Sequence, residues 1–328
     1  MKIDVHAHLI PQRCIDATEQ APGSWTWRFQ AGSGSYTSKT PASGFDADQI
    51  SGIDRRLSEM TQQGIDLQVL SVPPFCFFYD TDADVALDLC RRFNDAFADT
   101  VAANPDRFLA MATLPLQAPE EAARELERAV RDLGLRGVEI GSNIAGRNLD
   151  DPSLAPFYAK VQELDVPVFI HPFNVLGADR LSRYYLANLI GNPGDTTVAA
   201  ASLIFGGVLK EFPRLKFYLA HGGGTCPYIY GRWDHGWNAR PESRLHIDRP
   251  PSEYFRLLYF DTIVHGMPAL EYLVGSVGAE RVLLGTDYPF DMGDYDSVET
   301  VDALTNASAA DKELIQGGNA AALFKIEV

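Results

Sequence analysis

Two histidines lie one residue apart near the start of the chain, in the apolar stretch VHAHLI. In a β-strand, residues i and i+2 point to the same face, so His6 and His8 would project side by side. That placement is what two ligands of one metal ion need. A pair of solvated histidines on an edge strand would have the same spacing, and these six residues alone favour neither interpretation.

Three further residues of ligand type follow apolar runs elsewhere: His171 in FIHPF, His221 in LAHGGG and Asp287 in LGTDYPF. A lone histidine at the end of a strand is more often a hydrogen-bonded core residue than a ligand. Four histidines and an aspartate in equivalent positions argue against that explanation. Three imidazoles and a carboxylate suit Zn²⁺, or another divalent ion such as Mn²⁺. These four ligands would leave one position on the metal ion for a water molecule. The metal would lower the pKa of this water towards ~7, so that it could supply hydroxide.

The elements that must position these residues alternate along the chain. Helical patterns occupy 82–104, 119–134 and 309–325, the last interrupted by Gly317-Gly318. Nearly continuous apolar runs between such patterns indicate strands of a parallel sheet that is buried on both faces. The predicted strands are residues 2–7, 66–71, 107–113, 136–141, 166–171, 215–221, 256–261 and 281–287.

Eight strands in this order predict an α/β fold, a (β/α)8 TIM barrel, for which ~250 residues is typical. The 328 residues would form a single domain with two additions. One is a small antiparallel insertion after the first strand, at about residues 11–50. The other is a long loop at 222–254, rich in aromatic residues and arginine. A doubly wound sheet is the alternative, but no GxGxxG follows the first strand. In a barrel, the five metal-site candidates would meet at the carboxyl ends of the strands.

The composition is typical of a soluble globular protein and limits the possible partners. A formal net charge of -16 argues against nucleic acid or an anionic membrane surface, although local arginines could still bind a small anionic carboxylate. No apolar run approaches the ~20 residues of a membrane span, and no signal peptide precedes the first strand. The four cysteines are scattered without a CxxC pair, which favours a reducing, cytoplasmic location.

The HxH pair, the two later histidines and Asp287 resemble the metal-dependent amidohydrolase superfamily. Within it, the sequence is similar to the aminocarboxymuconate-semialdehyde decarboxylase branch over nearly the whole chain. The motifs that carry the resemblance are VHAHLIP, GIDLQVLS, FIHP, LKFYLAHGGG, GRWDHGW, RPPSEYF and VLLGTDYPF. The resemblance implies a metal-dependent, non-oxidative decarboxylase of a conjugated or aromatic acid, of the aminocarboxymuconate-semialdehyde or hydroxybenzoate type.

The same resemblance implies a role for each residue of the site. His221 would act as acid or base beside a metal-bound water. Asp287 is a second candidate for the proton donor, because related hydroxybenzoate decarboxylases are thought to use the equivalent aspartate in this way. Binuclear amidohydrolases carry a carboxylated lysine on the fourth strand, whereas RGVEIG has Glu139 there, which favours one metal ion. The implied metal ligands are His6, His8, His171 and Asp287.

Arg232, in GRWDHGW, resembles the family arginine that grips a substrate carboxylate from across a dimer interface. A guanidinium fork fits a carboxylate well, so a homodimer with Arg232 in the neighbouring active site is expected. The chain departs from the family at Phe173-Asn174, where Trp-Asp is usual. It also has no arginine from 29 to 54, so only Arg28 or Arg55 could be the family's second substrate arginine.

Two other predicted rim residues are candidates for substrate contact. Phe75, in PPFCFFYD, offers an aromatic wall for a planar acid or, equally, part of a packed cover over the barrel. His265 follows the seventh strand. The alternative function is a metal-dependent hydrolase of an amide, lactone or C–C bond, because the same hydroxide serves both reactions. The predicted substrate contacts are Arg232, Phe173, Asn174, Phe75 and His265.

Overall fold

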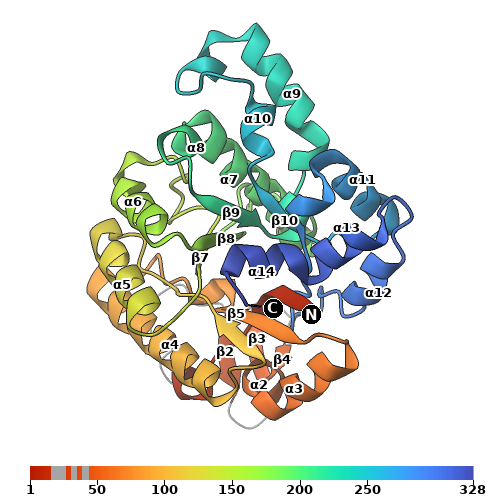
Figure 1. The fold of residues 1–328 in the computed structure, drawn as a ribbon. Coiled ribbons are helices and arrows are strands. Elements are labelled where there is room, and N and C mark those ends of the chain that lie inside the picture. Colours follow the sequence, from red (N-terminus) through yellow and green to blue (C-terminus); the bar gives the residue numbers. More distant parts are fainter. Residues whose placement is uncertain (16–26, 31–34, 39–43, 328) are drawn as a thin grey trace.

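The computed structural model describes residues 1–15, 27–30, 35–38 and 44–327. Within them, eight parallel strands form two sheets, ordered β1-β5-β6 and β11-β10-β9-β8-β7 (Figure 1). Each predicted strand is present; β1 is shifted by one residue towards the C-terminus and the others are shortened at one or both ends. The strands are β1 (Ile3–His8), β5 (Leu67–Ser71), β6 (Phe108–Ala110), β7 (Val138–Gly141), β8 (Pro167–His171), β9 (Lys216–Leu219), β10 (Tyr259–Asp261) and β11 (Val282–Leu283).

Backbone bridges join the two sheets at both seams. Ala7 of β1 forms a parallel bridge with Tyr288, which follows β11, and Ala112, which follows β6, does so with Val138 of β7. At the first seam, the His8 N–H also donates to Tyr288 O at 2.7 Å. The eight described strands therefore close into the predicted (β/α)8 barrel.

Helices cover the outside of the strands, and two of the predicted ones are confirmed. Helix α4 (Ala83–Ala103) is capped by Asp82, whose carboxylate accepts from the Asp84 N–H. Helix α5 (Pro119–Arg131) begins with proline and two glutamates and ends with two arginines, an order that suits the helix dipole. The other helices that surround the barrel are α2 (Ala47–Ser51), α3 (Ile53–Gln62), α6 (Ala155–Leu164), α7 (Asn192–Phe205), α8 (Val208–Glu211), α11 (Met267–Val277) and α12 (Ser297–Asp302).

The C-terminal stretch is helical but interrupted, as predicted. It consists of α13 (Ala309–Glu313), the short π-helix η8 (Leu314–Gly318) and α14 (Asn319–Phe324). A Cβ at Gly317 would lie 2.1 Å from the carbonyl oxygen of Met1, so only glycine lets the two chain ends pass here. Both termini lie at this end of the barrel (Figure 1), which α14 covers with Leu323 and Phe324.

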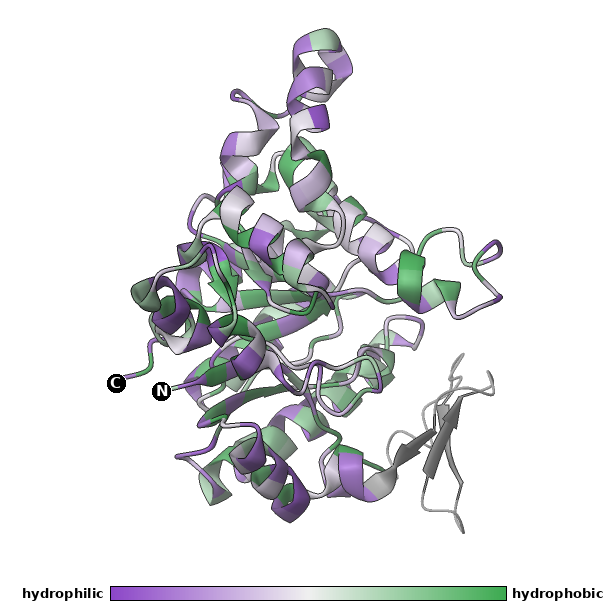
Figure 2. Ribbon diagram, turned by 90° about the vertical axis from the view of Figure 1, so that its right-hand side faces the viewer, coloured by the Kyte–Doolittle hydropathy of each residue, from purple (hydrophilic) through white to green (hydrophobic). Residues whose placement is uncertain are grey.

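The barrel interior is a packed apolar layer. Phe169 of β8 and Tyr218 of β9 stack with ring centroids 4.4 Å apart, and Phe169 meets the His6 ring edge-on at 4.7 Å. The strands at the centre of Figure 2 are mostly apolar, whereas polar residues gather on the outer helices. This layer gives the metal-site candidates a rigid, dry floor.

The prediction of a long loop at 222–254 is wrong, because most of this segment is helical. Helix α9 (Cys226–Ala239) and helix α10 (Pro251–Phe255), with the turn η6 (Pro241–Arg244) between them, project from the barrel (Figure 1). Tyr230 stacks on Phe255 at 5.1 Å, and Trp233 packs edge-on against the same ring at 6.3 Å. Tyr230 and Trp233 therefore pack α9 against α10.

The segment after β1 contains the predicted antiparallel insertion. Strands β2 (Trp27–Gln30), β3 (Ser35–Ser38) and β4 (Gly44–Asp46) pair antiparallel in sequence order. The rest of residues 16–43 lies outside the described residues. None of the described helices is long and apolar enough to cross a membrane.

Candidate active site

Five side chains meet at the carboxyl end of the barrel, as the strand-end pattern predicted. Nε2 of His6 lies 3.1 Å from Nε2 of His8, and each of these atoms lies 3.2 Å from Oδ1 of Asp287. Ligand atoms of His6, Asp287, His171 and His221 all lie within 4.8 Å of one another. His6, His8, His171 and Asp287 are buried.

The three buried imidazoles are held by their Nδ1 atoms. Because a carboxylate or carbonyl oxygen can only accept, each Nδ1 carries a hydrogen, which leaves Nε2 as the atom that can bind a metal. Metal-binding histidines are oriented by contacts of this kind. The acceptors are Asp261 Oδ2 for His6 at 2.7 Å, Val72 O for His8 at 2.9 Å and Pro172 O for His171 at 2.9 Å.

The converging atoms of the site include two buried acceptors that lack a donor. Nε2 of His171 and Oδ1 of Asp287 are buried and have no hydrogen-bond partner among the described residues. Buried acceptors that face one another repel unless a cation lies between them. Three imidazole nitrogens and a carboxylate oxygen suit Zn²⁺, and carboxylate also suits Mn²⁺. The donor set therefore fits one divalent metal ion.

The electrostatics of the metal-free site favour a proton where the metal would bind. Burial lowers the pKa of His6, but the nearby carboxylates of Asp287 and Asp261 outweigh it and raise that pKa to about 10. Burial together with the neighbouring imidazoles holds the pKa of His171 well below its ordinary value. Burial would raise the pKa of Asp287, but His6 and the other imidazoles hold it well below the usual range. A metal ion must therefore displace a proton from this group.

His221 differs from the other four residues because it faces open space. Its side chain is 15% exposed, its Nε2 lies 3.5 Å from Oδ2 of Asp287, and its Nδ1 has no partner among the described residues. His221 and Asp287 both have a left-handed backbone, with φ of 55° and 59°. Such strain costs ~1–3 kcal/mol per residue and is typical of functional sites.

The glycines after His221 are required by the close approach of other chain segments. Gly224 has φ 64°, and a Cβ there would lie 2.1 Å from the carbonyl oxygen of Pro193. Gly222 has φ 61°, and its Cβ would lie 2.3 Å from Cγ1 of Val264. The HGGG turn therefore fixes where the His221 side chain points.

Sequence reasoning missed Asp261, the residue that ties this turn to the metal site. Besides His6, its carboxylate accepts from the backbone N–H groups of His221 at 3.0 Å, Gly222 at 2.8 Å and Ile263 at 3.1 Å. Its position at the end of β10 was the available signal, since this carboxylate shares the rim with the metal-site candidates.

Arg56 was also missed, and the sequence carries no signal for it. It lies on α3, is fully buried, and donates through Nη2 to the carbonyl oxygen of His8 at 2.5 Å. Its guanidinium lies 4.4 Å from the ring centroid of Tyr288, the neighbour of Asp287. Arg56 thus links β1, which carries His6 and His8, to the segment after β11 that carries Asp287.

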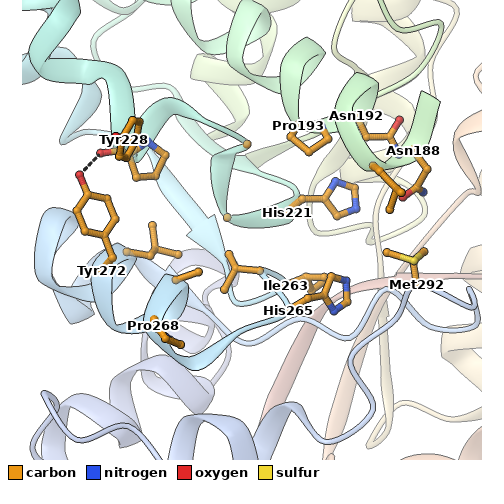
Figure 3. Close-up of a pocket in the computed structure, with 17 residues that line it drawn as sticks. Asn188, Asn192, Pro193, His221, Tyr228, Ile263, His265, Pro268, Tyr272 and Met292 are labelled. Carbon is orange, nitrogen blue, oxygen red and sulfur yellow. Dashed lines mark hydrogen bonds between the residues drawn. The ribbon is translucent and has the colours of Figure 1, made fainter. Parts of the chain in front are cut away.

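A cavity of about 370 Å³ opens above the metal-site residues. Phe75, Phe173 and Asn174, three of the predicted substrate contacts, line it, as does Phe290. The cavity also reaches the side chains of His171, His221 and Asp287. His265 does not line this cavity but an adjoining one, which Figure 3 shows.

The predicted arginines lie elsewhere. Arg232 is exposed on α9 and lines neither cavity. Arg55 pairs with Glu59 at 2.9 Å, and the side chain of Arg28 lies outside the described residues. Among the described lining residues of both cavities, none is a lysine or an arginine.

Comparisons with known proteins agree with this architecture. A family model described as "Amidohydrolase" matches residues 3–326. A 2-amino-3-carboxymuconate-6-semialdehyde decarboxylase from Dictyostelium discoideum is 39% identical over 325 residues, covering 98% of this chain and 90% of the relative. The crystal structure of a 5-carboxyvanillate decarboxylase from Sphingomonas paucimobilis is 29% identical, with a TM-score of 0.88 over 99% of both chains. A dihydroxybenzoic acid decarboxylase from Polaromonas sp. JS666, with bound manganese and the inhibitor 2-nitroresorcinol, is 29% identical with a TM-score of 0.82, covering 99% of this chain and 97% of that one.

Proposed function

The chain belongs to the amidohydrolase family, and on that premise we propose that it is a metal-dependent, non-oxidative decarboxylase of an aromatic or conjugated carboxylic acid. The observation that carries the proposal is the convergence of four buried donor groups and His221 below a cavity with aromatic walls. The relatives named above are decarboxylases of a carboxymuconate semialdehyde, a carboxyvanillate and a dihydroxybenzoic acid, which are acids of this class.

We assign the metal to His6, His8, His171 and Asp287. His8 is preferred to His221 as the fourth ligand because its Nε2 shares Oδ1 of Asp287 with His6, whereas His221 faces Oδ2. Zn²⁺ is the first candidate because three of the four donors are imidazoles, and Mn²⁺ is the second. Such an ion, when bound, supplies a Lewis acid that stabilises negative charge on substrate oxygens.

His221 is the group that we propose to move the proton. Loss of CO2 leaves carbanion character on the substrate carbon, which must then be protonated. His221 is part of the cavity wall, and Oδ2 of Asp287 lies close enough to its Nε2 to orient the ring. Asp287 is the less suitable proton donor, because its Oδ1 is turned towards the imidazoles of His6 and His8.

We further propose a homodimer in which Arg232 binds the substrate carboxylate in the neighbouring subunit. The described lining of the cavity offers no lysine or arginine to an anionic substrate. Arg232 is exposed and has no ion pair with a described residue. A guanidinium fork from the partner would complete the site and orient the carboxylate that is lost.

The proposal is tested by assaying CO2 release from a panel of hydroxybenzoic and aminocarboxymuconate-like acids. The protein is used as purified, after removal of metal by a chelator, and after restoration with Zn²⁺ or Mn²⁺. We expect CO2 from at least one acid, loss of activity after chelation and recovery with metal. Ammonia or ring-opened products without CO2 would indicate a hydrolase instead.

A further inference from the structure

A second cavity, of about 770 Å³, adjoins the one above the metal site. It extends from His221 past Ile263 and His265 to Tyr228 and Tyr272 at the far end (Figure 3). We call it the apolar lobe, and the smaller cavity the metal lobe. The two lobes share four lining residues: Asn188, Asn192, His221 and Met292.

The lining of the two lobes differs in charge. The metal lobe contains the carboxylates of Asp287 and Asp291. The apolar lobe has no aspartate, glutamate, lysine or arginine among the described residues that line it. The hydroxyl of Tyr272 in this lobe already donates to the carbonyl oxygen of Pro227 at 3.0 Å. Apart from the four shared residues, Tyr228 and His265, the remaining wall is mainly aliphatic, formed by Leu189, Ile263, Val264, Pro268, Ala269 and Leu273.

We propose that the apolar lobe binds an uncharged, apolar substituent of the substrate. This inference rests on the proposed function, and it specifies the acid: one reacting carboxylate in the metal lobe, and an alkyl or aryl group that extends past His221. The position of His221 supports it, because this residue lines both lobes and a substrate held beside its imidazole could extend from one lobe into the other.

The volumes and the charges point to the same class of acid. The metal lobe, at about 370 Å³, lies near the lower end of the ~300–1,000 Å³ range of small-molecule sites, and the apolar lobe is twice as large. A second carboxylate in the apolar lobe would lose its hydration without meeting a lysine or arginine on the described wall. Each buried methylene, by contrast, would raise kcat/KM about fourfold.

The first test compares substituted acids on the unmodified enzyme. Hydroxybenzoic acids that carry hydrogen, methyl, n-propyl or carboxylate at each ring position are assayed for CO2 release. At one position, we expect n-propyl to raise kcat/KM at least tenfold over hydrogen, and carboxylate to lower it at least tenfold. A kcat/KM for every alkyl acid that is equal to or lower than that of the unsubstituted acid would overturn the proposal. This result is also expected if a partner subunit fills the lobe. Release of CO2 from parent acids in that case would leave the proposed function standing.

The second test narrows the lobe. Ala269 is an exposed residue of α11 that lines the apolar lobe but not the metal lobe. We expect Ala269→Trp to lower the n-propyl to hydrogen ratio of kcat/KM at least tenfold. The matched control is Ala103→Trp, at the exposed end of α4, which should leave this ratio unchanged. An unchanged ratio in Ala269→Trp would contradict the assignment. Absence of CO2 from every hydroxybenzoic acid and every aminocarboxymuconate-like acid would overturn the proposed function together with it.

Discussion

Replacing Asp261 by asparagine should weaken metal binding although Asp261 is not a metal ligand. Oδ2 of Asp261 accepts from Nδ1 of His6 at 2.7 Å and from the His221 N–H at 3.0 Å, and Oδ1 accepts from two further backbone N–H groups. Asparagine keeps one accepting oxygen and presents an NH2 group on the other side. Two of these hydrogen bonds are therefore lost in either orientation of the amide.

The expected loss of metal affinity follows from the tautomer of His6. When the NH2 group lies opposite Nδ1, it needs an acceptor there, so the His6 tautomer with its hydrogen on Nε2 is favoured. This tautomer removes the Nε2 lone pair that faces the other ligands. Removing an outer partner of a metal-binding histidine typically lowers metal affinity ~10–100-fold, equivalent to ~1.4–2.7 kcal/mol. The two lost charge-assisted hydrogen bonds each contribute ~1.5–3 kcal/mol, so the free energy of unfolding should also fall.

Competitive metal titration with a chromophoric chelator measures this affinity. Asp195→Asn is the matched control, because Asp195 is also buried and accepts from Asn143 Nδ2 at 2.9 Å and the Leu176 N–H at 3.0 Å but touches none of the proposed ligand side chains. We expect Asp195→Asn to lower stability and to leave metal affinity within about twofold. Equal metal affinity in Asp261→Asn and the unmodified protein would refute the reasoning.

Three further predictions concern other parts of the site. His221→Gln should keep its metal but lower CO2 release at least ~100-fold, measured by metal analysis and turnover; full turnover would exclude His221 as the proton donor. Arg232→Ala should raise KM at least ~10-fold. Mixing it with His221→Gln subunits should restore about a quarter of the activity, because half the dimers then hold one complete site; no restoration would argue against an arginine supplied by the partner. Metal affinity should rise with pH by at least a factor of ten per unit up to about pH 10, because the raised pKa of His6 keeps a proton there that metal must displace. A flat titration curve would contradict this coupling.

The metal-site residues could be predicted because each lies next to a recognisable apolar strand. Once eight strands are inferred, the rule that active sites lie at the carboxyl ends of barrel strands brings His6, His171 and Asp287 to one rim without further information. The strand order and the antiparallel insertion followed from the same periodicity. The residues that we propose as metal ligands were therefore accessible from the sequence.

The supporting residues could not be predicted in this way. Arg56 is one polar residue on an amphipathic helix, and only the packed structure reveals that its guanidinium lies against the carbonyl oxygen of His8. Helix α9 was predicted as a loop. Its Trp233 and Tyr230 pack against Phe255 of α10, a contact that the sequence of this segment alone does not specify. The apolar lobe is likewise formed by side chains from η4 (Ala187–Gly191), α9 and α11, which lie far apart in the sequence.

The most direct test of metal-dependent decarboxylation at this site is one reaction in isotopically labelled water. An acid accepted in the panel is converted in D2O, and in a parallel reaction in water enriched in oxygen-18, by metal-loaded protein and by chelated protein. We predict one CO2 per product molecule and one deuterium at the carbon that lost it, with no oxygen-18 in the organic product and no reaction without metal. Oxygen-18 in the organic product without release of CO2, or equal turnover by the chelated protein, would contradict the account.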